Sequence, residues 1–307
     1  MKRFRAGLGY GVAAYLVWGT FPMYFGLIAM VNPLEVVPWR VSMTLLFCVL
    51  LVTLMRRWSQ VMTILKTPRL LGWFSLSSLL LYLNWQLFVI GVMTGNVIET
   101  ALGYFINPLF TILIGVVVRG EKLTRPQWIA VGIALVGVVI AAVGYGSFPW
   151  IAIGLAVSFG LYGAVHKHAG EAVDGVTGLT VETLVSVPIG VVQMIIVANV
   201  IGIGAFSHGP GIATLVLVSG VATAIPLILF GEASRRLPLS YLGFIQFLTP
   251  ILGFLYGFFV MHEEVSATRW IGFVAVWIAL VILISEMVAQ LRRSPQAETG
   301  PISVPLD

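Results

Sequence analysis

Charged residues and cysteine are both scarce in this sequence. Of its 307 residues, 9% are Asp, Glu, Lys or Arg and 59% are apolar, whereas about a quarter of the residues in an average globular domain are charged. A soluble chain of this length could not cover its surface with so few charges, so the composition predicts a protein embedded in lipid. The single cysteine, Cys48, lies in an apolar run, which excludes an intrachain disulfide or a metal site built on several cysteines.

The common sequence motifs of catalysis are also missing. The sequence has no Walker A loop, no HExxH or GxSxG motif and no cluster of metal ligands. We therefore expect no enzyme activity, no cofactor and no metal site. The net charge of +5 would suggest a nucleic-acid partner for a soluble domain. In a membrane protein such a charge is typical of cytoplasmic loops, so we expect no nucleic acid.

Long apolar runs fill most of the chain. A helix that spans a bilayer needs about 20 mostly apolar residues, and ten segments meet this condition, which predicts an all-α integral membrane protein. The predicted spans are residues 7–29, 35–55, 70–92, 98–118, 127–144, 148–166, 177–200, 211–231, 238–260 and 267–288. The polar tail, residues 292–307, is expected to be disordered.

Lys and Arg residues gather on one side of this arrangement. If the N-terminus lies in the cytoplasm, all of the 17 Lys and Arg residues except Arg40 and Arg269 fall on the cytoplasmic side. Cytoplasmic loops of membrane proteins carry an excess of these residues. The pattern therefore predicts that both termini lie in the cytoplasm.

The two halves of the chain repeat each other at a constant offset, with no gap in the register. The matching pairs are Phe105 and Phe247, Pro108 and Pro250, Gly115 and Gly257, Glu121 and Glu263, and Trp128 and Trp270. The offset predicts two five-helix domains, residues 1–145 and 146–291. Because five is odd, the second half enters the membrane from the opposite side, and the two repeats are inverted. Many secondary transporters have this plan, with the solute site at midplane between the repeats.

Two ionisable residues occupy equivalent positions within the predicted spans. Arg40 lies in the second span, either as a contact for an anion or as a side chain that reaches the membrane surface. Glu182 lies at the position that the repeat offset pairs with Arg40, but because the halves are inverted it falls near the inner side of the membrane and Arg40 near the outer side. We expect Glu182 to pair locally with His166 or Lys167 rather than with Arg40 or a solute.

Further polar and aromatic residues lie at bilayer depth. Glu99 and Asn107 share one helix face, which could line a cavity, although Glu99 could instead serve the start of its helix. Asn84 and Gln86 flank Trp85 and indicate either a pathway or hydrogen bonds between helices. Four prolines could bend their helices, namely Pro22, Pro188, Pro226 and Pro250. The predicted solute-binding residues are Trp18, Arg40, Asn84, Gln86, Glu99, Tyr104, Asn107 and Gln246.

Several segments carry a family resemblance. They include Leu102-Gly-Tyr-Phe-Ile-Asn-Pro108, Ala14-Tyr-Leu-Val-Trp-Gly19, Ser158-Phe-Gly-Leu-Tyr-Gly163 and Leu239-Ser-Tyr-Leu-Gly-Phe-Ile-Gln246. With them the chain resembles the EamA-type branch of the drug/metabolite transporter superfamily, and within it the RarD-like permeases. The resemblance implies ten helices in two EamA repeats and a bacterial-type inner membrane. It identifies no substrate.

These observations favour a secondary transporter that exports small organic metabolites or drugs by alternating access. Its partners would be a small-molecule solute, membrane lipid and a possible coupling proton, for which Glu99 is the candidate. One alternative is a membrane enzyme acting on a lipid-linked substrate, with Glu99 near His208. The other is a non-transporting membrane sensor, which the short loops disfavour because they leave little surface for signalling.

Overall fold

The computed structural model describes residues 2–143, 148–170, 173–260 and 265–293, and this part of the chain is helical with no strand. Its helices are α1 (Lys2–Gly19), α2 (Phe21–Gly26), α3 (Pro33–Leu54), α4 (Trp58–Lys66), α5 (Pro68–Met93), α6 (Val97–Arg119), α7 (Arg125–Val143), α8 (Trp150–Gly170), α9 (Gly175–Val200), α10 (Pro210–Ser234), α11 (Leu239–Gln246), α12 (Leu248–Phe259) and α13 (Ala267–Arg293). Most of the expected tail lies outside the described residues.

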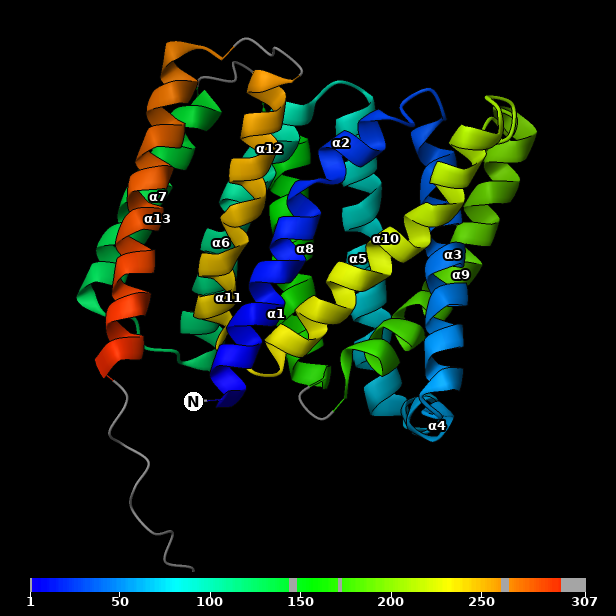
Figure 1. Cartoon of the computed structure of the whole chain (residues 1–307), viewed down its shortest axis with the longest axis horizontal. Helices are drawn as coiled ribbons and strands as arrows, with labels where there is room; N and C mark the ends of the chain where they lie inside the picture. Colours follow the sequence, from blue (N-terminus) through cyan, green and yellow to red (C-terminus); the bar gives the residue numbers. More distant parts are fainter. Residues whose placement is uncertain (1, 144–147, 171–172, 261–264, 294–307) are drawn as a thin grey trace, which may run out of the picture.

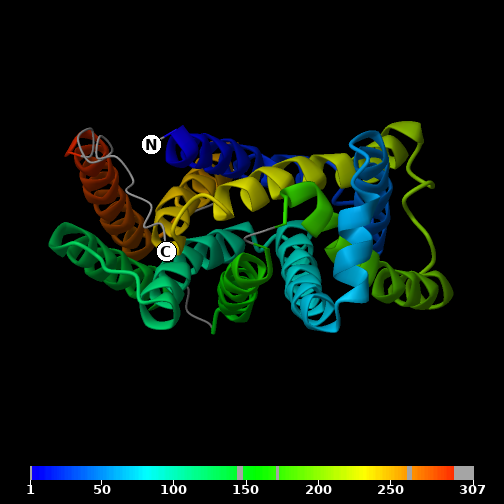
Figure 2. The ribbon, with the colours of Figure 1, turned by 90° about the horizontal axis from the view of Figure 1, so that it is seen from below.

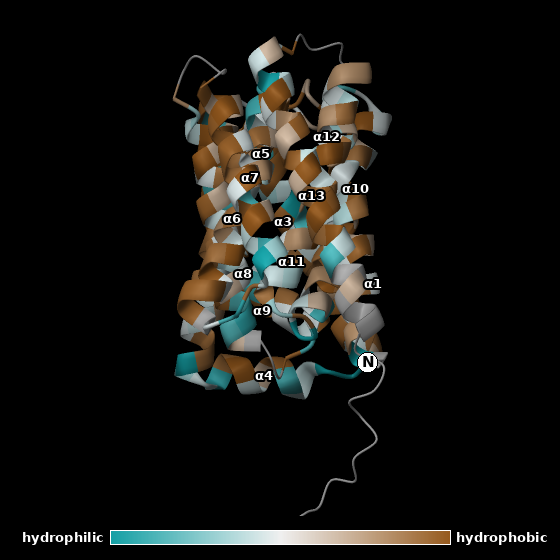
Figure 3. Cartoon of the chain, turned by 90° about the vertical axis from the view of Figure 1, so that its left-hand side faces the viewer, coloured by the Kyte–Doolittle hydropathy of each residue, from teal (hydrophilic) through white to brown (hydrophobic). Residues whose placement is uncertain are grey.

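Nine segments of the described chain are long and apolar enough to cross a membrane, with α11 and α12 together forming one of them. Helix α1 is not among the nine, because its 18 residues include Lys2, Arg3 and Arg5. Hydrophobic residues cover the sides of the bundle, and hydrophilic residues gather near α4 (Figure 3). The chain is therefore a multi-pass membrane protein, while the count of ten spans stays a prediction.

Two of the four prolines that could bend their helices lie beside a helix break. The first span is broken at Thr20, just before Pro22, and the span that contains Pro250 is broken at Phe247. Helices α9 and α10, in contrast, run without a break across Pro188 and Pro226. Proline removes one backbone hydrogen bond, and a long helix tolerates that loss when its neighbours hold it in place.

Equivalent helices of the two halves pack against each other. Helix α7 packs against α13 at one end of the bundle, α3 against α9 at the other, and α6 against α11 between them (Figures 1 and 2). Helix α1 begins at the face of the bundle where α4 lies, and we call this the N-terminal face. Helix α8 begins at the opposite face (Figure 1). The first helices of the two halves therefore run in opposite directions, as expected for inverted repeats.

The repeat is visible in individual contacts as well. Thr44 of α3 donates a hydrogen bond from Oγ1 to the backbone oxygen of Gly220 in α10 at 3.1 Å. At the repeat-equivalent positions, the hydroxyls of Ser186 in α9 and Ser78 in α5 lie 2.6 Å apart. The crossing of α3 with α10 thus repeats in the crossing of α9 with α5.

Three contacts join carboxylates of the first half to backbone amides of the second half. Glu121 accepts hydrogen bonds from the N–H groups of Leu239 and Ser240, both at 2.9 Å, at the start of α11. Glu35 accepts from the N–H groups of Gly204 and Ala205, and Glu99 accepts from the start of α8. Free N–H groups at a helix start favour a negative partner. These contacts place charged groups at the surfaces where the halves meet.

Candidate functional site

A cavity with about 460 Å³ of empty space lies between the two halves. Its lining comes from α1, α2, α3, α5, α6, α8, α11 and α12. The lining residues are Tyr15, Trp18, Phe21, Arg40, Asn84, Trp85, Phe88, Tyr104, Asn107, Phe159, Gln246 and Thr249. Both interrupted spans, α1–α2 and α11–α12, contribute to it. The site therefore combines one cation, several amides and hydroxyls, and a majority of aromatic rings.

Arg40 is the charged group of the cavity, and its side chain is 2% exposed. Its Nε donates a hydrogen bond to Oγ1 of Thr223 in α10 at 2.5 Å. Three rings surround the guanidinium, with Trp85 at 4.6 Å, Phe25 at 5.1 Å and Phe21 at 5.4 Å from its central carbon. Rings at these distances attract a cation by their quadrupole.

The guanidinium of Arg40 nevertheless retains a hydrogen-bond donor without a partner among the described residues. Within the described residues no carboxylate lies at ion-pair distance from it. Its buried Nη1 atom also lacks a hydrogen-bond partner in this part of the chain. A buried cation without a carboxylate is costly. The arrangement can therefore bind a negatively charged group that enters the cavity.

The amides of the cavity also join helices. Asn84 of α5 donates from Nδ2 to the backbone oxygen of Leu155 at 3.2 Å and to Oγ of Ser158 at 3.0 Å, both in α8. Thr111 of α6 donates to Oε1 of Gln246 at 3.2 Å and to Oδ1 of Asn107 at 3.4 Å. Asn84 thus satisfies both interpretations of the sequence, since it lines the cavity and bridges two helices.

The cavity continues toward the face opposite the N-terminus. A smaller pocket shares Trp18, Phe88, Tyr104 and Thr249 with it. Its other lining residues include Val97 and Thr100 in the first turn of α6, and Pro22 and Gly253. Because α6 begins at the opposite face (Figure 1), this pocket extends the cavity in that direction.

Aromatic rings close the cavity toward the N-terminal face. Phe230 of α10 lies 5.7 Å from Trp18, 5.5 Å from Phe159 and 5.8 Å from Tyr162, measured between ring centroids. Phe159 also meets Trp18 edge-on at 5.5 Å. These rings from α1, α8 and α10 form a layer that we call the aromatic layer.

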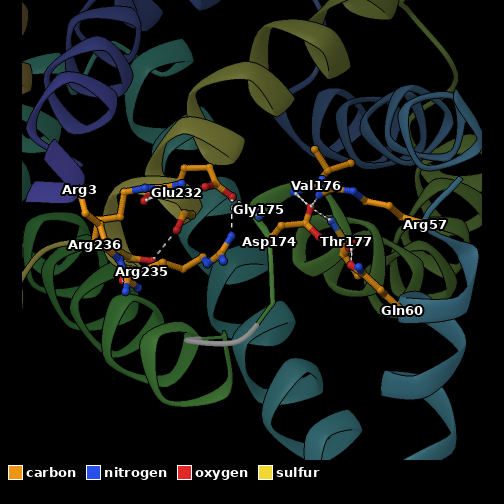
Figure 4. A network of polar contacts seen from close by, with 12 residues as sticks. Arg3, Arg57, Gln60, Asp174, Gly175, Val176, Thr177, Glu232, Arg235 and Arg236 are labelled. Atoms are coloured by element: carbon orange, nitrogen blue, oxygen red, sulfur yellow. Dashed lines mark hydrogen bonds and ion pairs between the residues drawn. The ribbon is translucent and has the colours of Figure 1, made fainter. Parts of the chain in front are cut away.

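Polar contacts reinforce the closure at the N-terminal face itself (Figure 4). Glu232 of α10 accepts hydrogen bonds from the N–H of Gly175 at 3.0 Å, and from Arg235 and Arg236. Asp174 caps α9 by accepting from Thr177 N–H at 3.1 Å and pairs with Arg57 at 2.7 Å. Partial burial of Asp174 raises its pKa, but its bonds to Thr177 and the charge of Arg57 together lower the pKa below the ordinary value.

A second buried polar cluster lies beneath the aromatic layer. Glu182 of α9 is 1% exposed and accepts a hydrogen bond from Ser77 of α5 at 2.5 Å. Its carboxylate also contacts Nδ1 of His166 at 2.8 Å and the hydroxyl of Tyr162 at 3.4 Å. The expected local pairing is therefore present with His166, while Lys167 donates to the backbone oxygens of Ser234 and Leu237.

Six of the eight predicted site residues meet at the cavity, and two do not. The six are Trp18, Arg40, Asn84, Tyr104, Asn107 and Gln246. Gln86 points away, and its Oε1 accepts a hydrogen bond from Gln193 of α9 at 2.7 Å. Glu99 accepts from the N–H of Ile151 at 2.8 Å, so it serves a helix start, but that of α8 rather than its own.

Sequence reasoning did not identify most of the aromatic lining. Phe21, Phe88 and Phe159 lie in apolar helices where nothing in the pattern sets them apart from lipid-facing rings. Thr249 could have been found, because the repeat offset pairs it with Asn107. That either set contacts a solute stays a prediction.

Comparison with known proteins agrees with this architecture. The profile of the EamA-like transporter family matches the chain twice, at residues 5–143 and 148–285. Protein RarD of Streptomyces exfoliatus is 40% identical over 94% of this chain and 91% of its own length. Protein RarD of Escherichia coli K12 is 36% identical over 95% and 98% of the two chains. An uncharacterized transporter of Bacillus subtilis, YojE, is 35% identical over 94% and 97%.

A solved structure supports the fold. A crystal structure described only as that of a protein superposes with a TM-score of 0.67 and covers 91% of this chain and 98% of its own. Its sequence identity is 16%, so it bears on the fold alone. Two family matches and full-length relatives at 35–40% identity show the family directly. The chain belongs to the EamA-like transporter family and is a membrane transporter.

Proposed function

We propose that this transporter is a secondary carrier that exports small organic solutes with a negatively charged group across a bacterial inner membrane. The solute binds in the central cavity, with its anionic group on Arg40. Ten spans in two inverted repeats, α1 and α2 together forming the first, bring both termini to the cytoplasm. The N-terminal face is then the cytoplasmic face.

The observation that carries this proposal is the buried guanidinium of Arg40. It is 2% exposed, has no carboxylate within ion-pair distance among the described residues, and keeps Nη1 without a partner. Intramembrane arginines are rare and usually pair with another group. A carboxylate, sulfonate or phosphate on the solute would supply that partner, since a guanidinium binds such groups with two parallel hydrogen bonds.

The remainder of the lining favours a solute with an apolar body. Trp18, Phe88 and Phe159 present rings, whereas Asn107 and Gln246 present amides. Small-molecule sites commonly combine apolar and aromatic walls with a few polar groups, as this lining does. An aromatic or amphipathic anion of modest size fits this combination of shape and chemistry.

The arrangement of closures supports our proposal of alternating access. The cavity extends toward the opposite face, while the aromatic layer and the contacts of Glu232 and Asp174 close the N-terminal face. Release or entry at that face requires α10 to separate from the start of α9. Two inverted repeats can exchange conformations, and that exchange would close one side as it opens the other.

Counterflow in liposomes tests the solute class. Purified protein is assayed with radiolabelled benzenesulfonate and, as the matched cation, phenyltrimethylammonium. We expect exchange of the anion only, and at least about a tenfold loss in R40Q, because a hydrogen bond to a charged group contributes about 1.5–3 kcal/mol. R69Q, which removes an exposed arginine, is the control. Equal exchange of the cation, or full activity in R40Q, would reject the anion assignment.

The direction of transport needs whole cells. Metabolites are compared inside cells and in the medium after deletion and overproduction of the protein. An exporter raises an organic anion in the medium on overproduction and inside the cell on deletion. The reverse pattern would identify an importer.

A further inference from the structure

We propose that His166 and Glu182 form a proton-binding site that couples solute movement to the proton gradient. The inference rests on the proposed transport function and adds its energy source. The observation behind it is a hydrogen-bonded imidazole and carboxylate, both nearly inaccessible to solvent, which contact the solute cavity through the rings of Tyr162 and Phe159. No other ion pair among the described residues is as deeply buried.

The geometry of the pair allows one proton to be gained and lost. Glu182 accepts from Ser77 at 2.5 Å, and its carboxylate lies 2.8 Å from Nδ1 of His166, which donates to it when Nδ1 carries the ring proton. With Nδ1–H donating to the carboxylate, a further proton adds at Nε2, and no other bond changes. Histidine is the side chain that ordinarily changes charge near neutral pH.

The surroundings of the pair contain few competing charges. A Cβ placed on Gly231 of α10 would lie 3.5 Å from Nε2 of His166, so this nitrogen faces the backbone of that helix. The titratable and charged groups on the packed helices include Cys48 of α3, Tyr162 and Lys167 of α8, Asp174 at the start of α9 and Glu232 of α10. Lys167, Asp174 and Glu232 are engaged by backbone groups or by Arg57, Arg235 and Arg236. Helix α5 contributes only hydroxyls to the pair, those of Ser77 and Ser78.

The pair is connected to the cavity through ring contacts. Phe159 lines the cavity and lies 5.4 Å from Tyr162, and Tyr162 lies 5.4 Å from the His166 ring. Phe230 of the aromatic layer touches all three rings. A change of charge on His166 therefore acts on the same layer that closes the solute cavity.

The pair also lies at the contact that has to open. Gly231 of α10 packs against Gly175 of α9, where an added Cβ would come within 2.9 Å of the Gly175 Cα. His166 is beside this contact, which the link between Glu232 and Gly175 also joins. Adding a positive charge beside so close a helix contact changes the free-energy difference between its closed and open forms.

This assignment moves the coupling role away from Glu99. The Glu99 carboxylate accepts a hydrogen bond from the start of α8 and does not line the cavity. We expect E99Q to leave the pH dependence of transport as it is in the unsubstituted protein. The predicted proton site is therefore the His166–Glu182 pair, whereas the sequence alone pointed to Glu99.

Proton binding can be measured without any solute. Purified full-length protein in liposomes is adsorbed to a solid-supported membrane and stepped from about pH 8 to about pH 6, which brackets the range where histidine ordinarily titrates. We expect a transient charge movement in the unsubstituted protein and its loss in H166Q and E182Q. H168Q is the matched control, because His168 lies two residues further along α8 and is exposed. E182D, which keeps a carboxylate, should retain the movement with a shifted midpoint.

Solute flux in the same liposomes separates this inference from the proposed function. The ratio of benzenesulfonate uptake with a pH gradient to uptake without one should fall to unity in H166Q and stay unchanged in H168Q. Charge movement in the absence of any benzenesulfonate exchange would reject the anion assignment and keep the proton site. Exchange without charge movement, or full charge movement in a folded H166Q, would overturn the proton site and leave the pair a structural bridge. If H166Q and E182Q do not fold, E182D decides through its midpoint, and an unshifted midpoint would count against the pair.

Discussion

Positions 40 and 182 occupy equivalent places in the two halves and have very different surroundings. Both lie on the helices that pack together at one end of the bundle, α3 and α9, and the repeat offset pairs them. Arg40 meets three rings and one hydroxyl and opens on the cavity. Glu182 meets two hydroxyls and an imidazole and is enclosed.

Equivalent helix crossings lie beside these two positions. Thr44 with Gly220 in one crossing corresponds to Ser186 with Ser78 in the other. The duplicated halves thus keep a common helix crossing while each crossing presents a different charge. In our proposals Arg40 contacts the solute, whereas Glu182 with His166 binds the proton. Two similar helix crossings therefore serve two different ligands.

Exchanging the small residues of the two crossings should have the largest effect. A Cβ on Gly220 would lie 2.3 Å from the Cβ of Met43 and 2.5 Å from the Thr44 nitrogen. Because backbone atoms cannot move aside, we expect G220S to destabilise the protein by about 3 kcal/mol. The reverse change, S78G, loses hydrogen bonds and places a glycine inside α5, and should cost about 2 kcal/mol. Thermal unfolding in detergent measures both, and G132A, where an added Cβ meets nothing within 4 Å, is the control.

Removing the two charges should change stability in opposite directions. E182A leaves Ser77 and His166 without their acceptor and should cost about 2–3 kcal/mol. R40Q removes a buried cation that lacks a carboxylate and should leave the unfolding temperature unchanged or raise it. A large loss of stability in R40Q would mean that Arg40 is structural, and would erase the contrast between the two positions.

Substitutions of two glutamines test which residues belong to the solute site. Gln246 lines the cavity, whereas Gln86 bonds to Gln193 outside it. We expect Q246A to weaken binding of benzenesulfonate by about 3–10-fold, the value of one hydrogen bond, and Q86A to leave it unchanged. Quenching of tryptophan fluorescence reports the affinity, since Trp18 and Trp85 lie in the cavity. An equal loss in both variants would place the site elsewhere.

The smallest expected effect concerns the closure at the N-terminal face. Asp174 caps α9 and pairs with Arg57, and because Asn keeps a capping oxygen but no charge, D174N should cost about 0.5–1 kcal/mol at neutral pH. Because the pKa of Asp174 is lowered from its ordinary 3.8, the stabilisation is complete above that value and disappears as the pH falls through the lowered one. Unfolding curves of D174N and the unsubstituted protein should therefore converge in strong acid, and a gap that persists there would contradict this account.

Much of the architecture could be predicted because lipid imposes strong rules on a sequence. The boundaries of α3, α5 and α9 fall within a few residues of the predicted spans. Helix α4 was not predicted, since it is too short to span and follows the basic pair Arg56 and Arg57. Helix α1 contains Lys2, Arg3 and Arg5, so its length and composition alone do not identify it as a membrane span.

The site was partly predictable for a similar reason. A polar group such as Arg40 or Asn107 stands out in an apolar helix, whereas Phe159 does not, because its ring is as suited to lipid as to a cavity. Gln86 was wrongly grouped with Asn84, because residues two apart on a helix point in different directions. Tertiary packing decides which of the two faces inward, and only Asn84 turns toward α8.

The carboxylates of Glu35 and Glu121 have a consequence for biosynthesis. Both belong to the first half, and their described partners include amides of residues 204–205 and 239–240. A ribosome delivers those amides only after most of the first half has entered the membrane. In a nascent chain, these two carboxylates therefore lack hydrogen-bond donors that have not yet been synthesised. The first half reaches its final structure only when the second half is complete. Truncated chains that end before α11 should accordingly be targets for membrane proteases.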